Sequence, residues 1–581
     1  MMDRLNRREA VARLGLLLGA STLSSACASL PLAAGAKRPN IVLVVLDDTG
    51  FSDFGCFGAE IRTPAIDALA ASGLRYSHFD TRAICSPTRA ALLSGRNSHT
   101  MNMLDLTAGG KTPRANVPGV LRQNARLLPA VLKDAGYVTL GVGKWHLSPA
   151  WEDGAPGNNA NWPLQRGFDQ FYGFIGGWQD QYRPELIDGN RNIGKPDDPG
   201  YHFSSAIVDE AIARIDKLDA KDPFFLYLAF GATHSPVQVR EEWIDRYAGV
   251  YERGWDAIRE ERLARQKRMG LVPPETELPP HDPRDRQWSS LSDNERQVYA
   301  RFMATYAGFL EHADAQLGRL VEDLKQRGEY ENTLFVVLSD NGPSSEGGET
   351  GSFGRLYPPE PADPDALIDR MPAIGREQIA MQVPWTIASA TPYRRYKSWP
   401  YLGGVRAPLI VSWAAGNLEA GAIRHQAVDD IDIAPTLAQL AGASFAVPDG
   451  EAVQIPLAGR TITATMASAS APSPRPVQYF ELRGNRAIRA GHWRAVAVHR
   501  LGTPFETDEW RLFDMDNDPN ESRDLSATNP EKLAELKALW ESEARRYGVT
   551  LTEGPDYMRQ YDVYADEFDT GRETNNKETK Q

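Results

Sequence analysis

A cysteine and an arginine four residues apart, Cys85 and Arg89, form the most distinctive chemical pattern in this sequence. Ser86 is a candidate N-cap, Pro87 suits the first turn of a helix, and Gly95 favours its end. Cys85 is therefore expected just before a helix N-terminus, where unpaired backbone N–H groups and the helix dipole attract anions. This position suits either a reactive thiolate or a residue that meets an anionic substrate. A buried structural cysteine is the alternative.

Four apolar segments each end in charged, imidazole or amide side chains. The segments and the polar residues that follow them are 41–46 with Asp47 and Asp48, 137–142 with Lys144 and His146, 223–230 with His234, and 333–338 with Asp340 and Asn341. Strands that are apolar on both faces are typical of buried parallel sheets. Because ligands bind at the carboxyl edge of such sheets, these side chains are expected to converge there.

A hard divalent cation would suit four of these residues, Asp47, Asp48, Asp340 and Asn341. Adjacent carboxylates repel one another unless a cation or hydrogen-bond donors lie between them. The set contains no histidine or thiolate, which argues against zinc, and ligand number favours Ca²⁺ over Mg²⁺. The alternative is that the two adjacent aspartates simply open a loop and cap a helix.

Cationic and proton-transferring groups for an anionic substrate are also present, namely Arg89, Lys144, His146 and His234. An isolated histidine more often has a structural role. His146 and His234 differ from the other histidines because each follows an apolar strand at the same predicted sheet edge.

These elements predict an α/β fold with a large, mixed, mostly parallel central sheet flanked by helices, followed by a small C-terminal antiparallel sheet plus helix. The helical patterns in the first part are 64–72, 127–135 and 304–327. Short alternating segments between 478 and 513 predict the antiparallel strands, and 530–547 is an amphipathic helix. The predicted domains are 37–450 (catalytic), 451–565 (C-terminal subdomain) and 566–581 (tail).

Composition excludes several classes of protein. The 581 residues include 64 Lys and Arg against 77 Asp and Glu, a net charge of −13 that disfavours nucleic acid as a partner. Cysteine occurs three times, as Cys27, Cys56 and Cys85, which excludes a disulfide framework and a four-thiolate zinc cluster. A single disulfide between Cys56 and Cys85 stays open.

Residues 1–36 are predicted to be a signal segment of the twin-arginine type. Arg7 and Arg8 precede an apolar run, 11–23, that is too short for a comfortable membrane span. The mature protein is therefore expected in the bacterial periplasm. Lipidation of Cys27 is the alternative, and membrane attachment is expected only in that case.

Two further segments differ from the core in composition. The charged stretch 240–294 contains a helical pattern, 258–267, that predicts a solvated helix in an insertion. The Gly/Pro-rich stretch 344–384 predicts a long loop near the mouth of the site. Together with 99–106, this loop is expected to influence substrate choice.

The stretch Cys85-Ser86-Pro87-Thr88-Arg89 resembles the Cys-x-Pro-x-Arg signature of type I sulfatases, in which the cysteine is oxidised after translation to formylglycine. Other motifs follow the order and approximate spacing of bacterial arylsulfatases of the alkaline phosphatase superfamily. These motifs are Asp47-Asp48, Gly143 to Leu147, His234-Ser235-Pro236, Ser339 to Gly342, and Lys397.

This resemblance implies a set of ligands and a set of catalytic residues. The implied ligands of Ca²⁺, with Mg²⁺ less favoured, are Asp47, Asp48, Asp340, Asn341 and an oxygen of modified Cys85. The residues implied to surround the sulfate are Arg89, Lys144, His146, His234 and Lys397. Three arginines, Arg394, Arg395 and Arg406, flank Lys397, so the alignment stays open there.

The resemblance also implies hydrolysis of small-molecule sulfate monoesters, aryl or alkyl, by a formylglycine hydrate. One hydroxyl attacks sulfur, and His234 or Lys397 protonates the departing alcohol. His146 then deprotonates the second hydroxyl so that sulfate is expelled. The implied protein partner is the maturation enzyme that generates formylglycine.

Two other functions fit the same residues. A phosphonate monoester or phosphodiester hydrolase of the same superfamily would use the same kind of site for a phosphoryl group. A non-catalytic relative would keep the anion pocket with Cys85 unmodified.

Overall fold

The computed structural model describes residues 37–110, 112, 117–152, 159–219, 221–446, 453–553 and 564. The predicted signal segment 1–36, with Cys27, and the predicted tail 566–581 lie outside the described residues. Within the part of the chain that is described, no helix combines the length and apolar character that a membrane span requires.

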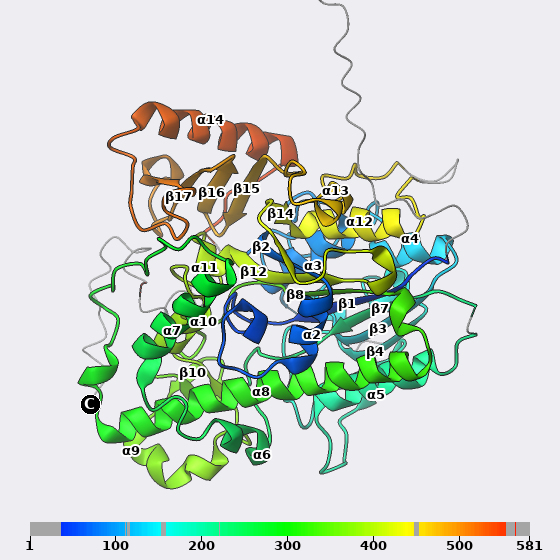
Figure 1. Cartoon of the computed structure of the whole chain (residues 1–581), viewed down its shortest axis with the longest axis horizontal. Coiled ribbons are helices and arrows are strands. Elements are labelled where there is room, and N and C mark those ends of the chain that lie inside the picture. The colour runs from blue at the N-terminus through cyan, green and yellow to red at the C-terminus, as the bar shows by residue number, and fades with distance from the viewer. Residues whose placement is uncertain are drawn as a thin grey trace, which may run out of the picture.

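A single large sheet occupies the centre of the molecule (Figure 1). In the described chain it has eleven strands, in the order β13 (Ala422–Arg424), β2 (Leu74–Asp80), β12 (Arg406–Ser412), β8 (Thr333–Ser339), β1 (Asn40–Leu46), β7 (Phe224–Ala229), β3 (Val138–Lys144), β4 (Gln170–Phe174), β5 (Leu186–Asp188) and β6 (Arg191–Gly194), with β14 (Val428–Asp429) beside β2. The five strands from β8 to β4 are parallel, whereas β12 runs antiparallel to both of its neighbours. The predicted mixed, mostly parallel sheet is confirmed, and its four predicted strands are β1, β3, β7 and β8.

Alternate residues of β1 face two separate hydrophobic cores. Val42, Val44 and Leu46 pack with helices on one face of the sheet, and the intervening Ile41, Leu43 and Val45 pack with helices on the other. The first face carries α2 (Pro64–Ser72), α5 (Phe203–Ile215) and α8 (Asp293–Gln326), and the second carries α3 (Cys85–Ser94), α4 (Leu128–Asp134) and α12 (Ile433–Leu440). The strand is thus buried on both sides, as its apolar sequence predicts.

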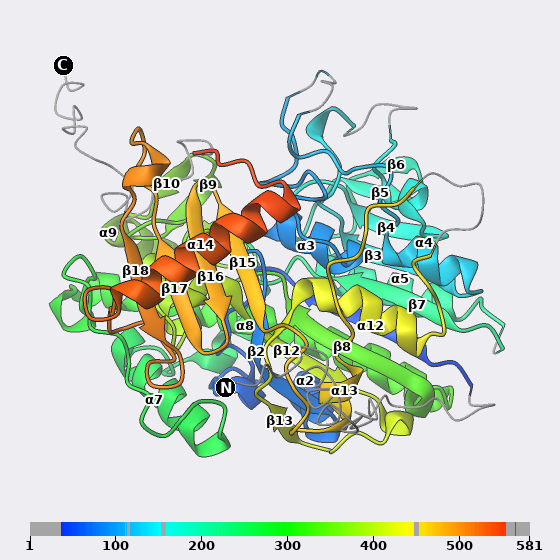
Figure 2. The ribbon, with the colours of Figure 1, turned by 90° about the horizontal axis from the view of Figure 1, so that it is seen from above.

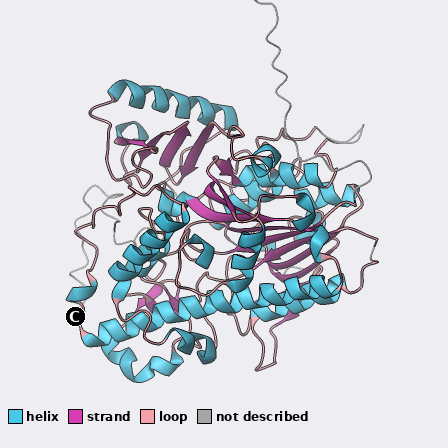
Figure 3. Cartoon of the chain, in the orientation of Figure 1, coloured by secondary structure: helices cyan, strands magenta, loops and turns pink. Residues whose placement is uncertain are grey.

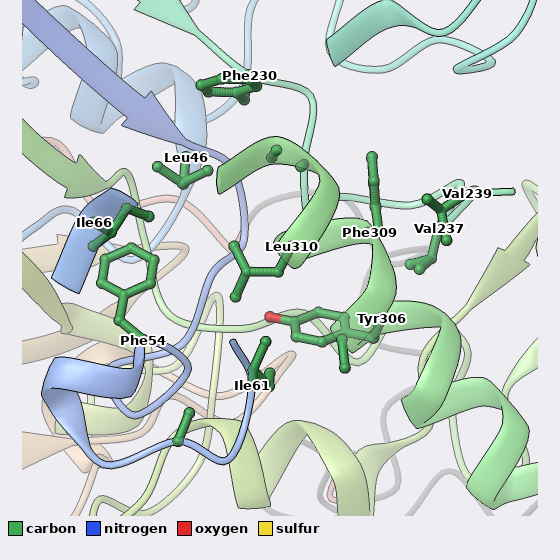
Figure 4. Close-up of a cluster of buried hydrophobic side chains, with 14 of the residues drawn as sticks. Leu46, Phe54, Ile61, Ile66, Phe230, Val237, Val239, Tyr306, Phe309 and Leu310 are labelled. Atoms are coloured by element: carbon green, nitrogen blue, oxygen red, sulfur yellow. The ribbon is translucent and has the colours of Figure 1, made fainter. Parts of the chain in front are cut away.

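The long helix α8 covers much of the first face (Figure 1). Figure 4 shows Tyr306, Phe309 and Leu310 of this helix among other buried apolar side chains. The helix begins at Asp293, earlier than the predicted 304, because Ser292 and Glu295 form a capping box in a stretch with few apolar residues.

A second, antiparallel sheet follows near the C-terminus, as predicted (Figures 2 and 3). Its strands are β15 (Val477–Leu482), β16 (Asn485–Ala490), β17 (Trp493–Ala497) and β18 (Trp510–Asp514), and α14 (Pro530–Tyr547) packs across one face. Leu536 and Trp540 of α14 are buried against Tyr479 and Ile488 of this sheet.

Ion pairs join the two sheets. Arg489 of β16 lies with its Nε 3.6 Å from Oδ2 of the buried Asp80 of β2. Arg475, just before β15, donates from Nε to Asp432 Oδ2 at 3.0 Å. Because buried carboxylates are costly without a counter-charge, these contacts hold the C-terminal sheet against the central one.

The segment predicted as a long loop, 344–384, is not a plain loop. It contains a small sheet of β9 (Ser352–Leu356), β10 (Pro359–Pro361) and β11 (Ile379–Ala380), together with α9 (Pro364–Leu367) and the start of α10 (Val383–Ser389). The Gly and Pro residues of 344–384 therefore mark the turns of a compact structure rather than a structureless stretch.

Three further short α-helices in the described chain are α6 (Glu241–Ile244), α11 (Leu402–Val405) and α13 (Thr463–Ala467).

The helix predicted at 258–267 forms, but the prediction that it is solvated is wrong for one of its faces. These residues belong to α7 (Gly254–Met269), in which Arg259, Arg262 and Gln266 are buried. The guanidinium of Arg262 lies 2.6 Å from Asp53 Oδ1 and 2.8 Å from Glu60 Oε1. Its charge is satisfied inside the protein by residues distant in sequence, which a count of charged residues along the helix does not reveal.

We expect Arg262→Ala to destabilise the protein by about 3–5 kcal/mol, because it leaves buried carboxylates without their counter-charge. Arg253→Ala, at the residue just before the same helix, removes an exposed pair with Glu261 and should cost less than about 1 kcal/mol. Thermal and urea unfolding of the two variants measure the difference. Equal losses for both would contradict the proposed role of the buried pair.

Candidate active site

The polar residues that follow four strands converge at the carboxyl edge of the central sheet. Asp47 and Asp48 follow β1, Asp340 follows β8, Lys144 ends β3, and His234 lies beyond β7. These side chains are all buried. Because β7 and β8 flank β1 in parallel, their ends deliver side chains to one place.

Each of the three aspartates pairs with a buried cation. The pairs are Lys144 Nζ with Asp47 Oδ2 at 2.6 Å, Arg89 Nε with Asp340 Oδ2 at 2.8 Å, and Lys397 Nζ with Asp48 Oδ2 at 2.9 Å. Burial raises the pKa of Asp47, and the ammonium of Lys144 offsets only part of that rise. The centre therefore combines strong opposite charges in a space from which water is largely excluded.

Cys85 is the first residue of α3 and is buried beside His146, with Sγ 3.1 Å from Nδ1. Burial raises the pKa of this thiol to about 11, despite the opposing effect of Lys144 and Lys397. A thiolate at neutral pH, one of the two roles left open by the sequence, is therefore disfavoured. Cys56 and Cys85 are both free, so the disulfide left open between them does not form.

Ser86 does not cap the helix, contrary to expectation. The N-cap is Ile84, which makes no side-chain cap hydrogen bond, and Ser86 Oγ instead donates to the backbone oxygen of His146 at 3.0 Å. The serine thus ties the start of α3 to the loop after β3, which carries His146.

His146 is buried and lies near the positive charges of Lys144 and Arg89. Burial, reinforced by these charges, holds the pKa of His146 well below its usual value. Its imidazole is consequently neutral near neutral pH and can accept a proton from a group at position 85.

Lys397 reaches the site, while the arginines near it in sequence do not take its place. Its Nζ lies 2.9 Å from both Asp48 Oδ2 and Glu346 Oε1. Arg395 pairs with Asp282, and Arg406 pairs with Asp80.

Glu346 belongs to this centre and was not predicted. Besides contacting Lys397, its Oε1 lies 3.6 Å from His234 Nε2. Burial would raise the pKa of Glu346, but Lys397 and His234 together hold it below its usual range. The sequence offers one weak indication of this position, since Glu346 is the first carboxylate after the Asp340-Asn341 pair.

The donor set fits a hard divalent cation. Among the described residues, Asp47 Oδ1 and Asn341 Oδ1 are buried acceptor atoms without a hydrogen-bond partner. Ligand atoms of Asp47, Asp48 and His234 lie within 4.8 Å of one another. A cation there would satisfy oxygens that otherwise stay desolvated and unpaired. The imidazole of His234 therefore lies beside the predicted oxygen ligands, to which the sequence had assigned no histidine.

A cavity of about 770 Å³ leads to this centre. Cys85, His146, His234 and Lys397 line its inner part. Both segments expected near the mouth contribute to its wall, since Leu106 comes from 99–106 and Tyr357 from 344–384.

Known proteins share this architecture and sequence. The model of the family described as Sulfatase matches residues 39–443. An uncharacterized sulfatase of Schizosaccharomyces pombe is 30% identical over 539 residues, covering 87% of this chain and 93% of that protein. The arylsulfatase of Klebsiella aerogenes is 31% identical over 487 residues, covering 79% of this chain and 99% of that protein.

Among solved structures, Ps i-CgsB in complex with k-i-k-neocarrahexaose has a TM-score of 0.60 at 25% identity, covering 87% of this chain and 93% of that chain. Its likeness extends over both the central sheet and the C-terminal part. Members of the sulfatase family normally use formylglycine and a divalent metal, and the centre described above offers a possible metal site. The chain therefore belongs to the sulfatase family and is a sulfuric ester hydrolase.

Proposed function

We propose that Cys85 is oxidised to formylglycine by a maturation enzyme and that its hydrate supplies the nucleophile for hydrolysis of a small-molecule sulfate monoester. The observation that carries this proposal is the position of Cys85. It stands at the start of α3, 3.1 Å from a neutral histidine and among cations that suit an anionic ester. The raised pKa of the unmodified thiol supports a modified residue as the reacting group.

Arg89 and Lys144 hold the charge of the bound sulfate. Both are buried and already oriented, Arg89 by Asp340 and by the phenol of Tyr227 at 3.1 Å, and Lys144 by Asp47. Because the sulfate is charged in both the ground state and the transition state, removing either cation should weaken binding as well as turnover.

His146, His234 and Lys397 move protons. Nδ1 of His146 faces position 85, so it accepts a proton from a hydroxyl there. His234 Nε2 and Lys397 Nζ lie 3.6 and 2.9 Å from Asp48 Oδ2. Either can donate a proton to the departing alcohol.

Ca²⁺ is the divalent cation that we propose for this centre, held by Asp47, Asp48, Asp340 and Asn341 together with an oxygen of modified Cys85. Carboxylate and amide oxygens in this number favour Ca²⁺ over Mg²⁺ and zinc. When bound, the cation offsets the charge of the ester and polarises it.

The division of the chain is also a proposal: a catalytic domain at 37–450, a C-terminal subdomain at 451–565 and a tail at 566–581. The family match ends at residue 443 and β15 begins at Val477, which supports a boundary between them.

The nucleophile is tested with Cys85→Ser. We expect kcat for an aryl sulfate to fall by about 10³-fold or more, because serine cannot form an aldehyde hydrate. Cys56→Ser, at the other described cysteine, should keep activity. Mass spectrometry of the Cys85 peptide from wild-type protein made with the maturation enzyme should show the aldehyde or its hydrate.

An unmodified thiol in fully active protein would contradict the proposal. Activity on matched sulfate and phosphate esters separates a sulfatase from a phosphonate monoester or phosphodiester hydrolase.

The metal is tested by calorimetry and thermal unfolding of chelator-treated protein. Ca²⁺ at 100 times its Kd should stabilise the protein by about 2.7 kcal/mol. Asp48→Asn should weaken Ca²⁺ binding by about tenfold or more, because it removes a ligand charge. Asp105→Asn, which changes a carboxylate that lines the cavity outside this set, should bind Ca²⁺ normally. Tighter binding of Mg²⁺ than of Ca²⁺ would refute the metal assignment.

We propose that residues 1–36 are a signal that directs export of the protein to the periplasm by the twin-arginine route. Replacing Arg7 and Arg8 with lysine should retain the protein in the cytoplasm, whereas Arg4→Lys should not. Cell fractionation measures both variants. If wild-type protein stays with the membrane fraction and Cys27→Ser releases it, Cys27 is lipidated and the signal is not simply cleaved.

A further inference from the structure

Two large aromatic side chains stand at the cavity with much of their surface in solvent. Trp178 and Tyr357 are each 39% exposed, although large aromatic residues normally bury most of their area. Both line the 770 Å³ cavity that contains Cys85, and their ring centroids lie 5.3 Å apart with the planes at 40°. An exposed aromatic pair inside a catalytic cavity is available for contact with a substrate.

Tyr357 is held in place by the catalytic centre. Its phenol donates a hydrogen bond to the carboxylate of Glu346, and the same carboxylate contacts Lys397 Nζ at 2.9 Å. Because the hydroxyl is committed to Glu346, the ring of Tyr357 offers the cavity mainly its apolar surface. Tyr357 is thus fixed relative to the group proposed to protonate the departing alcohol, and Trp178 contacts its ring.

Apolar side chains also line the cavity, beside the polar Asp105, Thr107 and Arg483. The apolar ones include Leu106, Ala108, Val117 and Pro118. A volume of this size is typical of sites for small molecules, in which apolar walls bury most of the ligand.

The described cations of the cavity wall already have carboxylate partners. Lys397 contacts Asp48 and Glu346, and Arg483 binds Asp105 through Nε at 2.9 Å and Nη2 at 2.8 Å. Among the described wall residues, a second anionic group on the substrate would have to break one of these pairs or lie beside Glu346. Both are unfavourable in a partly desolvated site.

We propose that this site is selective for sulfate esters of flat, uncharged, aromatic alcohols, and that Trp178 and Tyr357 are the residues that determine this selectivity. The ring of the alcohol packs against the aromatic pair while the sulfate lies at Cys85. An additional carboxylate or sulfate on the alcohol is disfavoured. This inference rests on the proposed function and narrows its substrate class.

The first test compares 4-nitrophenyl sulfate with its 3-carboxy derivative, because the two leaving groups have similar reactivity. We expect wild-type protein to hydrolyse the uncharged ester with a kcat/KM at least about tenfold higher, since the cations that the structure describes in the cavity wall are already paired with carboxylates. Equal values, or preference for the carboxylated ester, would overturn the inference while leaving sulfatase function intact. Failure to hydrolyse either ester by protein with modified Cys85 would instead refute the proposed function.

The second test uses Trp178→Ala, Trp178→Phe and, as a control, Ile193→Ala. Ile193 is an exposed apolar residue of β6 that does not line the cavity. Trp178→Ala should lower kcat/KM for 4-nitrophenyl sulfate about tenfold, mainly through KM, because an aromatic contact is lost. Hydrolysis of ethyl sulfate, which has no ring to pack, should change little.

Trp178→Phe should restore most of the loss, and Ile193→Ala should behave as wild type. Unchanged thermal unfolding of Trp178→Ala verifies that the effect is local. The same loss on ethyl sulfate as on the aryl ester would contradict a role in selectivity.

Discussion

The structure depends on keeping three carboxylates together out of contact with water. Asp47, Asp48 and Asp340 meet at the end of two parallel strands, and each would be strongly unfavourable there alone. Lys144, Lys397 and Arg89 provide the opposing charge, and they come from a strand end, a distant loop and a helix start. The order of the strands and the position of α3 therefore serve one electrostatic requirement. The same arrangement of opposite charges suits both a cation and an anionic ester.

The fold could be predicted largely from its apolar runs. β1, β3, β7 and β8 are buried on both faces, so their sequences are largely apolar, with most of their polar residues at the strand ends. The failures lie where charge is satisfied at long range. The arginines of α7 look like a solvated surface in sequence, but Arg262 is enclosed by Asp53 and Glu60. Pairing of this kind depends on tertiary contacts, which the periodicity of apolar and polar residues along a helix does not indicate.

The active site shows the same difference between residues whose positions follow from local sequence patterns and residues that are placed by tertiary contacts. The convergence of the residues that follow strands with Cys85 and Arg89 could be predicted, because their positions are tied to local structure. Glu346 and Trp178 could not, since each lies in an irregular segment where nothing in the sequence specifies direction. The predicted cap at Ser86 is wrong because the helix begins at Cys85, so Ser86 lies inside it, and its hydroxyl donates to the backbone oxygen of His146 in another loop. The charged centre can thus be predicted from the sequence, whereas the aromatic part of the cavity wall forms only on folding.

The turn between β15 and β16 places Arg483 in the cavity wall, and the residues just before β15 supply Arg475 to Asp432. The C-terminal sheet and the residues just before it therefore complete the cavity and do not form an independent unit. A shortened protein would lose a side of its cavity and leave an interior aspartate without its counter-charge. Insertions and deletions in this region should therefore evolve together with the catalytic part, so that the specificity of one half constrains the architecture of the other.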